Sequence, residues 1–85
     1  MVTFTHKISD PKGLHAINAA RFAMFCRECP CVVHVARGDM AADGRQMMGL
    51  MKLRAKRGEV LEFRVDAAGE EEAAEELREL AGELL

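Results

Sequence analysis

The spacing of apolar residues changes between residues 8 and 16, and this change restricts the possible folds more than any other feature of the sequence. Before it, apolar and polar residues alternate, which predicts a strand with one buried face. After it, apolar residues follow the spacing of a buried helical stripe, at Ala19, Phe22, Ala23 and Cys26. Pro11 and Gly13 lie between the two patterns and predict a loop. The chain is therefore expected to begin as a strand, a loop and a helix over about 16–27.

The same two spacings recur along the rest of the chain. Strands are predicted over 31–37, 40–42 and 59–66, and helices over 46–53 and from about residue 69 onward. Gly38 and Asp39 predict a hairpin turn between the first two of these strands. The order β-α-β-β-α-β-α indicates an α+β fold, in which a four-stranded antiparallel sheet has helices packed on one face.

The length of 85 residues fits a single domain over residues 1–85. A formal net charge of −2 gives no general attraction to nucleic acid, and no apolar run is long enough to predict insertion into a membrane. The first seven residues lack the apolar centre of a signal peptide, so we expect a cytoplasmic protein. Residues 45–57 are basic and residues 70–83 are strongly acidic, which indicates either a partner surface or two solvated faces.

His15 lies where the first helix is expected to begin. The first backbone N–H groups of a helix have no partner within the helix, and the helix dipole adds partial positive charge at the same end. An imidazole at this point could carry or meet an anion, phosphate above all. The sequence therefore marks His15, with the backbone N–H groups of Ala16 and Ile17, as a candidate phosphate site.

Two features of the apolar pattern leave alternatives open. A second apolar stripe on the first helix contains Ile17, Ala20 and Met24, and it is either a contact surface for a partner or part of a wide core face. On the first strand, His6 falls on the apolar face. We expect it in or beside the core, with its ring nitrogen hydrogen-bonded.

Three cysteines and a histidine form a C-x-x-C-x-C-x-x-H cluster at Cys26, Cys29, Cys31 and His34. Such a cluster suggests either a zinc or redox site or small apolar packing. Packing is favoured because Cys26 falls on the buried helical stripe, and because Cys31 and His34 point to opposite faces of a strand. We therefore predict no metal and no cofactor, with His34 on the solvent face.

Nearly the whole chain also resembles a known family. The matching segments are Pro11, Gly13-Leu14-His15-Ala16, Ala19-Ala20, Met48-Gly49-Leu50-Met51 and Gly58-Glu59-Val60-Leu61-Glu62-Phe63. In these segments the sequence resembles the histidine-containing phosphocarrier proteins, the HPr family of the bacterial sugar phosphotransferase system. The resemblance implies an open-faced β-sandwich with His15 exposed at the start of the first helix. It also implies that His15 accepts a phosphoryl group from Enzyme I, which phosphoenolpyruvate charges, and passes it to a IIA component.

The sequence departs from the family pattern directly after His15. The family usually has arginine and then proline at the positions of Ile17 and Asn18. Arginine would supply a charge-assisted hydrogen bond to phosphate, which Ile17 cannot. Asn18 offers a backbone N–H and a side-chain amide as a partial substitute, and Arg21 is a further candidate one turn along the helix. His15 is therefore predicted as the acceptor, in a phosphate site that has lost one contact.

A second departure concerns regulation and docking. Gln46 stands where many relatives have a serine that a kinase phosphorylates, so we predict no regulatory serine. The partner surface that the resemblance implies combines the first two helices. Its residues are Ile17, Ala20, Met24, Met47, Met48 and Met51. Methionine adapts to several partner shapes, although some of these residues, Met51 above all, are equally compatible with the core.

Two functions follow from these observations. The first is a monomeric phosphocarrier that works with Enzyme I and IIA components and forms a phosphohistidine without turnover chemistry of its own. The alternative is a regulatory binding module on the same scaffold, which docks through the apolar surface and transfers little or no phosphate. His15 favours the first function, and the loss of arginine and proline after it favours the second.

Overall fold

The computed structural model describes residues 1–29, 31–66 and 70–85. Seven elements follow one another in the predicted order. They are β1 (Val2–Lys7), α1 (Ala16–Glu28), β2 (Val32–Arg37), β3 (Met40–Asp43), α2 (Met47–Lys52), β4 (Val60–Asp66) and α3 (Glu70–Leu84). Each element that was predicted with both ends lies within two residues of its expected bounds, because its apolar spacing is local. The predicted start of the last helix includes Gly69, which lies outside the described residues.

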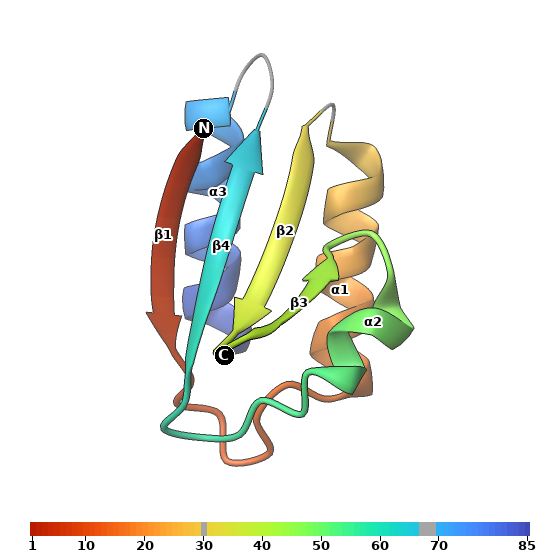
Figure 1. Ribbon diagram of the computed structural model, residues 1–85, viewed down its shortest axis with the longest axis vertical. Helices are drawn as coiled ribbons and strands as arrows, with labels where there is room; N and C mark the ends of the chain where they lie inside the picture. The colour runs from red at the N-terminus through yellow and green to blue at the C-terminus, as the bar shows by residue number, and fades with distance from the viewer. Residues whose placement is uncertain (30, 67–69) are drawn as a thin grey trace.

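The four strands form one antiparallel sheet in the order β1-β4-β2-β3. The pair β1 and β4 joins Val2 to Val65 and Lys7 to Val60, so the first and last strands of the chain are neighbours. The three helices cover one face of the sheet, as Figure 1 shows, and no helix among the described residues lies over the other face. The predicted fold, an α+β open-faced β-sandwich, is confirmed.

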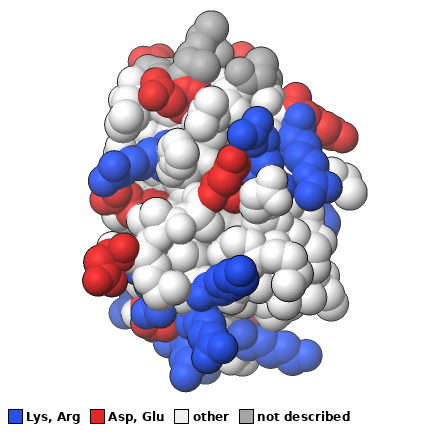
Figure 2. Space-filling model, turned by 45° about the vertical axis from the view of Figure 1, so that its right-hand side comes forward, with Lys and Arg blue, Asp and Glu red and all other residues white. Residues whose placement is uncertain are grey.

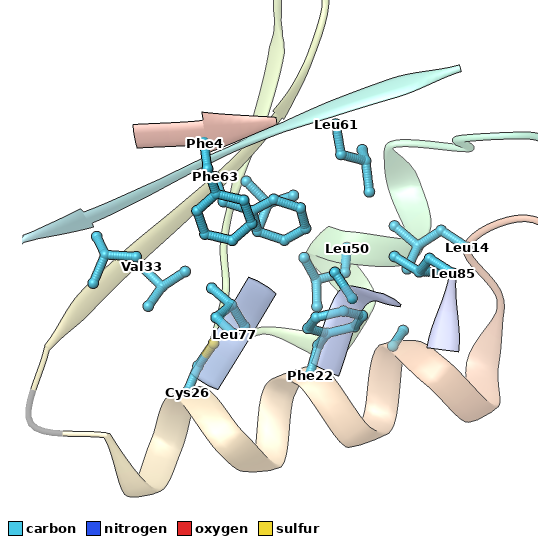
Figure 3. Close-up of a cluster of buried hydrophobic side chains, with 14 of the residues drawn as sticks. Phe4, Leu14, Phe22, Cys26, Val33, Leu50, Leu61, Phe63, Leu77 and Leu85 are labelled. Carbon is cyan, nitrogen blue, oxygen red and sulfur yellow. The ribbon is translucent and has the colours of Figure 1, made fainter. Parts of the chain in front are cut away.

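The core lies between the sheet and the helices. Phe63 of β4 is 1% exposed, and its ring stacks on Phe4 at 4.9 Å and on Phe22 at 5.8 Å between centroids. Figure 3 shows these rings from β1, β4 and α1 meeting in one cluster. Each such aromatic pair stabilises a fold by about 0.5–1.5 kcal/mol beyond its burial. Phe63 therefore ties α1, and the loop before it, to the middle of the sheet.

His6 is half-buried on β1, as its place on the apolar face predicted. The expectation that its ring is hydrogen-bonded is wrong for the part of the chain that the structure describes, where the buried Nε2 atom has no hydrogen-bond partner. The physical reason is that its neighbours on the inner face, Phe4 and Ile8, are apolar.

None of the helices among the described residues has both the length and the apolar character needed to cross a bilayer.

Candidate functional site at the start of the first helix

His15 is the N-cap residue of α1, with the extended backbone angles φ −127° and ψ −179°. Its side chain is 29% exposed. The first hydrogen bond of the helix runs from the N–H of Ala19 to the carbonyl of His15 at 2.8 Å. The N–H groups of Ala16 and Ile17 precede this bond and belong to exposed residues. The structure thus places the imidazole beside helix-start donors, in the arrangement that suits an anion.

Asn18 has a different role from the one its sequence position suggested. It is 2% exposed, and its Nδ2 donates to the carbonyl of Gly13 at 2.9 Å. Its Oδ1 accepts a hydrogen bond from the backbone N–H of His15 at 2.8 Å. The side-chain amide is therefore engaged within the protein rather than free for a ligand, whereas the expected phosphate contact of the Asn18 backbone N–H stays a prediction. Asn18 instead fixes the loop that presents His15.

Asp10 lies beside His15, a neighbour that sequence reasoning missed. Its Oδ2 lies 3.8 Å from Nε2 of His15, and its Oδ1 accepts the N–H of Lys12 at 2.8 Å. A carboxylate at this distance places negative charge beside Nε2 and favours a proton on that ring nitrogen. The only signal in the sequence was an acidic residue in the same short loop as the histidine.

The loop before His15 rests on the segment after α2. Leu14 donates its N–H to the carbonyl of Ala55 at 2.9 Å. Gly13 has a left-handed φ of +67°, and a Cβ atom there would clash with the carbonyl of Ala55 and lie 2.9 Å from Cα of Lys56. Glycine is therefore required at this position for its conformation and for the close approach of the two backbones.

Ile17 stands at the position of the family's arginine, and Arg21 follows about one turn further along α1. Both are exposed, and Ile17 has 72% of its surface accessible. Among residues 1–29, 31–66 and 70–85, no hydrogen bond or ion pair joins Arg21 to His15. The structure brings Asp10, His15 and Asn18 together, whereas Arg21 is not part of their hydrogen-bond network.

The second apolar stripe of α1 is largely outside the core, and it lies beside α2. Met24 is 60% exposed and Met48 is 66% exposed. Ala20, Met47 and Met51 are half-buried, and the two methionines pack partly against the core. Met51 therefore lies at the edge of the core, packed against it, rather than fully inside it. Together with Ile17, these side chains form an exposed apolar surface on α1 and α2. Gln46 is the N-cap residue of α2.

The cysteines pack as small apolar side chains. Cys26 is 1% exposed, and burial raises the pKa of its thiol to about 12, which keeps it protonated. Cys31 is buried, Cys29 is half-buried, and His34 is exposed on the outer face of the sheet. The interpretation of packing is thus confirmed for Cys26 and Cys31. In the described part of the chain, no three His, Cys, Asp or Glu side chains are placed to hold a metal ion.

The fold and the histidine together define a class of small α+β protein that presents an imidazole at the start of a helix. Residues 2–83 match the family model described as the phosphotransferase-system HPr component phosphorylation site. The chain belongs to this HPr family. It is 35% identical over 74 residues to the phosphocarrier protein HPr of Neisseria meningitidis, a match that covers 87% of this chain and 83% of the relative. The HPr of Pseudomonas aeruginosa is 38% identical over 74 residues, covering 86% and 82%.

Solved structures agree with this assignment. HPr-C-His from Thermoanaerobacter tengcongensis superposes with a TM-score of 0.89 at 28% identity, covering 96% of this chain and 92% of that one. The Crh protein of Bacillus subtilis, which was described as a domain-swapped dimer, gives a TM-score of 0.77 at 25% identity, covering 98% and 95%. Crh is thus a protein of similar fold that has been described as a swapped dimer.

Proposed function

We propose that this protein is a phosphocarrier of the phosphoenolpyruvate-dependent sugar phosphotransferase system, with His15 as the phosphoryl acceptor. The observation that carries the proposal is the position of the imidazole at the N-cap of α1, beside the uncommitted N–H groups of Ala16 and Ile17. Enzyme I is the donor and a IIA component is the acceptor in this proposal. The carrier acts in the cytoplasm, as a monomer and without a cofactor.

The chemistry requires a neutral ring nitrogen with a free lone pair. The carboxylate of Asp10 lies beside Nε2, so Nδ1 of His15 is the nucleophile in this proposal. A bond forms between Nδ1 and phosphorus while the bond from phosphorus to the donor breaks, and the proton stays on Nε2. The new phosphoryl oxygens lie at the start of α1, where backbone N–H groups and the helix dipole offset their charge.

The missing arginine affects the strength of phosphate binding rather than the identity of the acceptor. Ile17 supplies a backbone N–H but no charged side chain, so the phosphohistidine loses one charge-assisted hydrogen bond. The side chain of Ile17 instead enlarges the exposed apolar surface with Met24 and Met48. This surface suits the docking of Enzyme I or a IIA component beside His15.

The experiment is a phosphorylation assay read by intact mass. The protein is incubated with phosphoenolpyruvate and a bacterial Enzyme I, and a conventional HPr is labelled in parallel. We expect an acid-labile increase of about 80 Da, one phosphoryl group, that is lost in His15→Ala. An unlabelled protein beside a labelled conventional HPr would contradict the proposal and favour the regulatory binding module. Labelling that persists in His15→Ala would show that another residue is the acceptor.

A further inference from the structure

The segment between α2 and β4 carries cations that the phosphate site does not use. Arg54, Lys56 and Arg57 are all exposed. With Arg37 and Glu59 they line a shallow hollow of about 420 Å³. Figure 2 shows Lys and Arg side chains gathered at the lower end of the molecule, the end where this segment lies in Figure 1. Within the described residues, no carboxylate forms an ion pair with Arg54, Lys56 or Arg57.

The structure holds the backbone of this segment in place. The carboxylate of Glu59 accepts the N–H of Lys56 at 2.7 Å and pairs with the guanidinium of Arg37 at 3.0 Å. Arg37 also donates from Nε to the carbonyl of Leu53. Glu59 thus offsets the charge of Arg37 while it fixes the turn, and the other three cations keep their charge unpaired. A fixed backbone lowers the entropy cost when exposed side chains meet a partner.

The cationic segment is joined directly to the histidine loop. Leu14 bonds to Ala55, and Gly13 lies against Lys56. On the far side, the N–H of Gly58 donates to the carbonyl of Ile8 at 2.8 Å. Figure 1 shows the two loops running together at the same end of the molecule. A protein that covers His15 therefore comes close to this segment as well.

We propose that Arg54, Lys56 and Arg57 form an electrostatic contact for acidic side chains of the protein that docks on His15. This inference rests on the proposed function and names the chemistry of the partner surface: aspartate and glutamate beside its phosphoryl site. Charge complementarity of this kind speeds association and selects the partner. It also places charge at the edge of a docking surface whose centre, around Ile17, Met24 and Met48, is apolar.

The arrangement favours an acidic protein over a small anion such as inorganic phosphate. A small-anion site needs several donors that converge on one point in a sheltered pocket. Here the half-buried cation, Arg37, is already committed to Glu59 and Leu53. The remaining three cations are exposed and spread along four residues. Such a row fits carboxylates distributed over a protein surface.

The test compares two double variants that remove the same charge. Lys56→Gln with Arg57→Gln alters the cationic segment. Arg64→Gln with Arg78→Gln removes two cations that are paired with Glu62 and Glu75 elsewhere. The ¹⁵N-labelled proteins are titrated with Enzyme I in the absence of phosphoenolpyruvate, at low and at high salt. We expect the first pair alone to raise Kd, roughly five-fold at low salt and less at high salt.

Each outcome decides the inference. Equal Kd values for the two double variants, at any salt concentration, would overturn it, and so would a failure of the wild type to bind. Wild-type protein that binds with this charge dependence but is not phosphorylated would refute the proposed function while supporting the contact. Titration with inorganic phosphate completes the test. Saturable shifts of the Arg54, Lys56 and Arg57 amides at low millimolar phosphate would assign the segment to a small anion instead.

Discussion

Oδ2 of Asp10 lies 3.8 Å from Nε2 of His15, and both side chains are about 30% exposed. The contact is longer than a hydrogen bond, so it acts on the imidazole electrostatically and is partly screened by solvent. Within the proposed carrier, its effect is to keep the proton on Nε2. This relationship connects the loop after β1 to the reacting atom and leads to the first prediction.

Asp10→Asn is expected to slow phosphoryl acceptance about two- to five-fold, or roughly 0.4–1 kcal/mol, because the negative charge beside Nε2 is removed. Asparagine keeps an oxygen for the N–H of Lys12, so the loop should hold its shape. The measurement is the initial rate of phosphoprotein formation with limiting Enzyme I. Asp39→Asn, in the exposed hairpin, removes the same charge and serves as the control. Equal rates for the two variants would show that Asp10 does not act on His15.

Ile17→Arg is expected to accelerate phosphoryl acceptance about ten-fold, because it restores a charge-assisted hydrogen bond of the kind worth about 1.5–3 kcal/mol. The position is 72% exposed, so the longer side chain meets no core packing. Ile17→Gln is the matched control, since it adds polar length without charge. A gain of the same size in both variants would attribute the effect to lost apolar surface rather than to the guanidinium.

Asn18→Ala is expected to lower the free energy of unfolding by about 2–3 kcal/mol, because it leaves the Gly13 carbonyl and the His15 N–H without their partner. Urea unfolding, with an unchanged m value, measures the effect. Asn18→Asp keeps an acceptor for His15 but turns a carboxylate oxygen toward the Gly13 carbonyl at a buried position, so it should destabilise the fold as well. If Asn18→Ala lowers the free energy of unfolding by less than about 0.5 kcal/mol, these two hydrogen bonds do not hold the loop in place.

Asp43 makes stability dependent on acid pH. Hydrogen bonds from Arg45 lower the pKa of the Asp43 carboxyl from 3.8 to about 2 in the folded protein. A carboxyl with a lowered folded-state pKa contributes stability above its usual pKa and loses that contribution as the pH falls through the folded-state value. The stability advantage of wild type over Asp43→Asn should therefore be full at pH 5 and nearly absent at pH 2. Urea unfolding at pH 5, 3.5 and 2 measures this advantage, and an advantage that stays constant with pH would show that the Asp43 carboxyl is not its cause.

The order of the elements was predictable because each depends on apolar spacing within a few residues. The order of the strands was not. The pairing of β1 with β4 joins Phe4 to Phe63, and no local pattern relates residues so far apart in the chain. The open-faced arrangement was expected from the resemblance to a family, and the sheet pairings account for it physically.

The site divides in the same way. His15 was predictable from its place before a helical stripe, and the buried Cys26 from its place within that stripe. The contacts of Asp10 and Asn18 were not predictable, because both depend on the path of an irregular loop that turns back on itself between residues 10 and 18. For Asn18, the missing information was that its side chain faces Gly13 rather than solvent.

The close packing of Gly13 determines which residues would have to be transferred to move the His15 site to another protein. The backbone of Gly13 lies so close to Ala55 and Lys56 that no side chain fits between them. A graft of residues 9–18 alone would leave that close contact unformed and the loop free to relax. The transplantable unit is therefore two segments, residues 9–18 together with 53–59, and a designed carrier would have to inherit both.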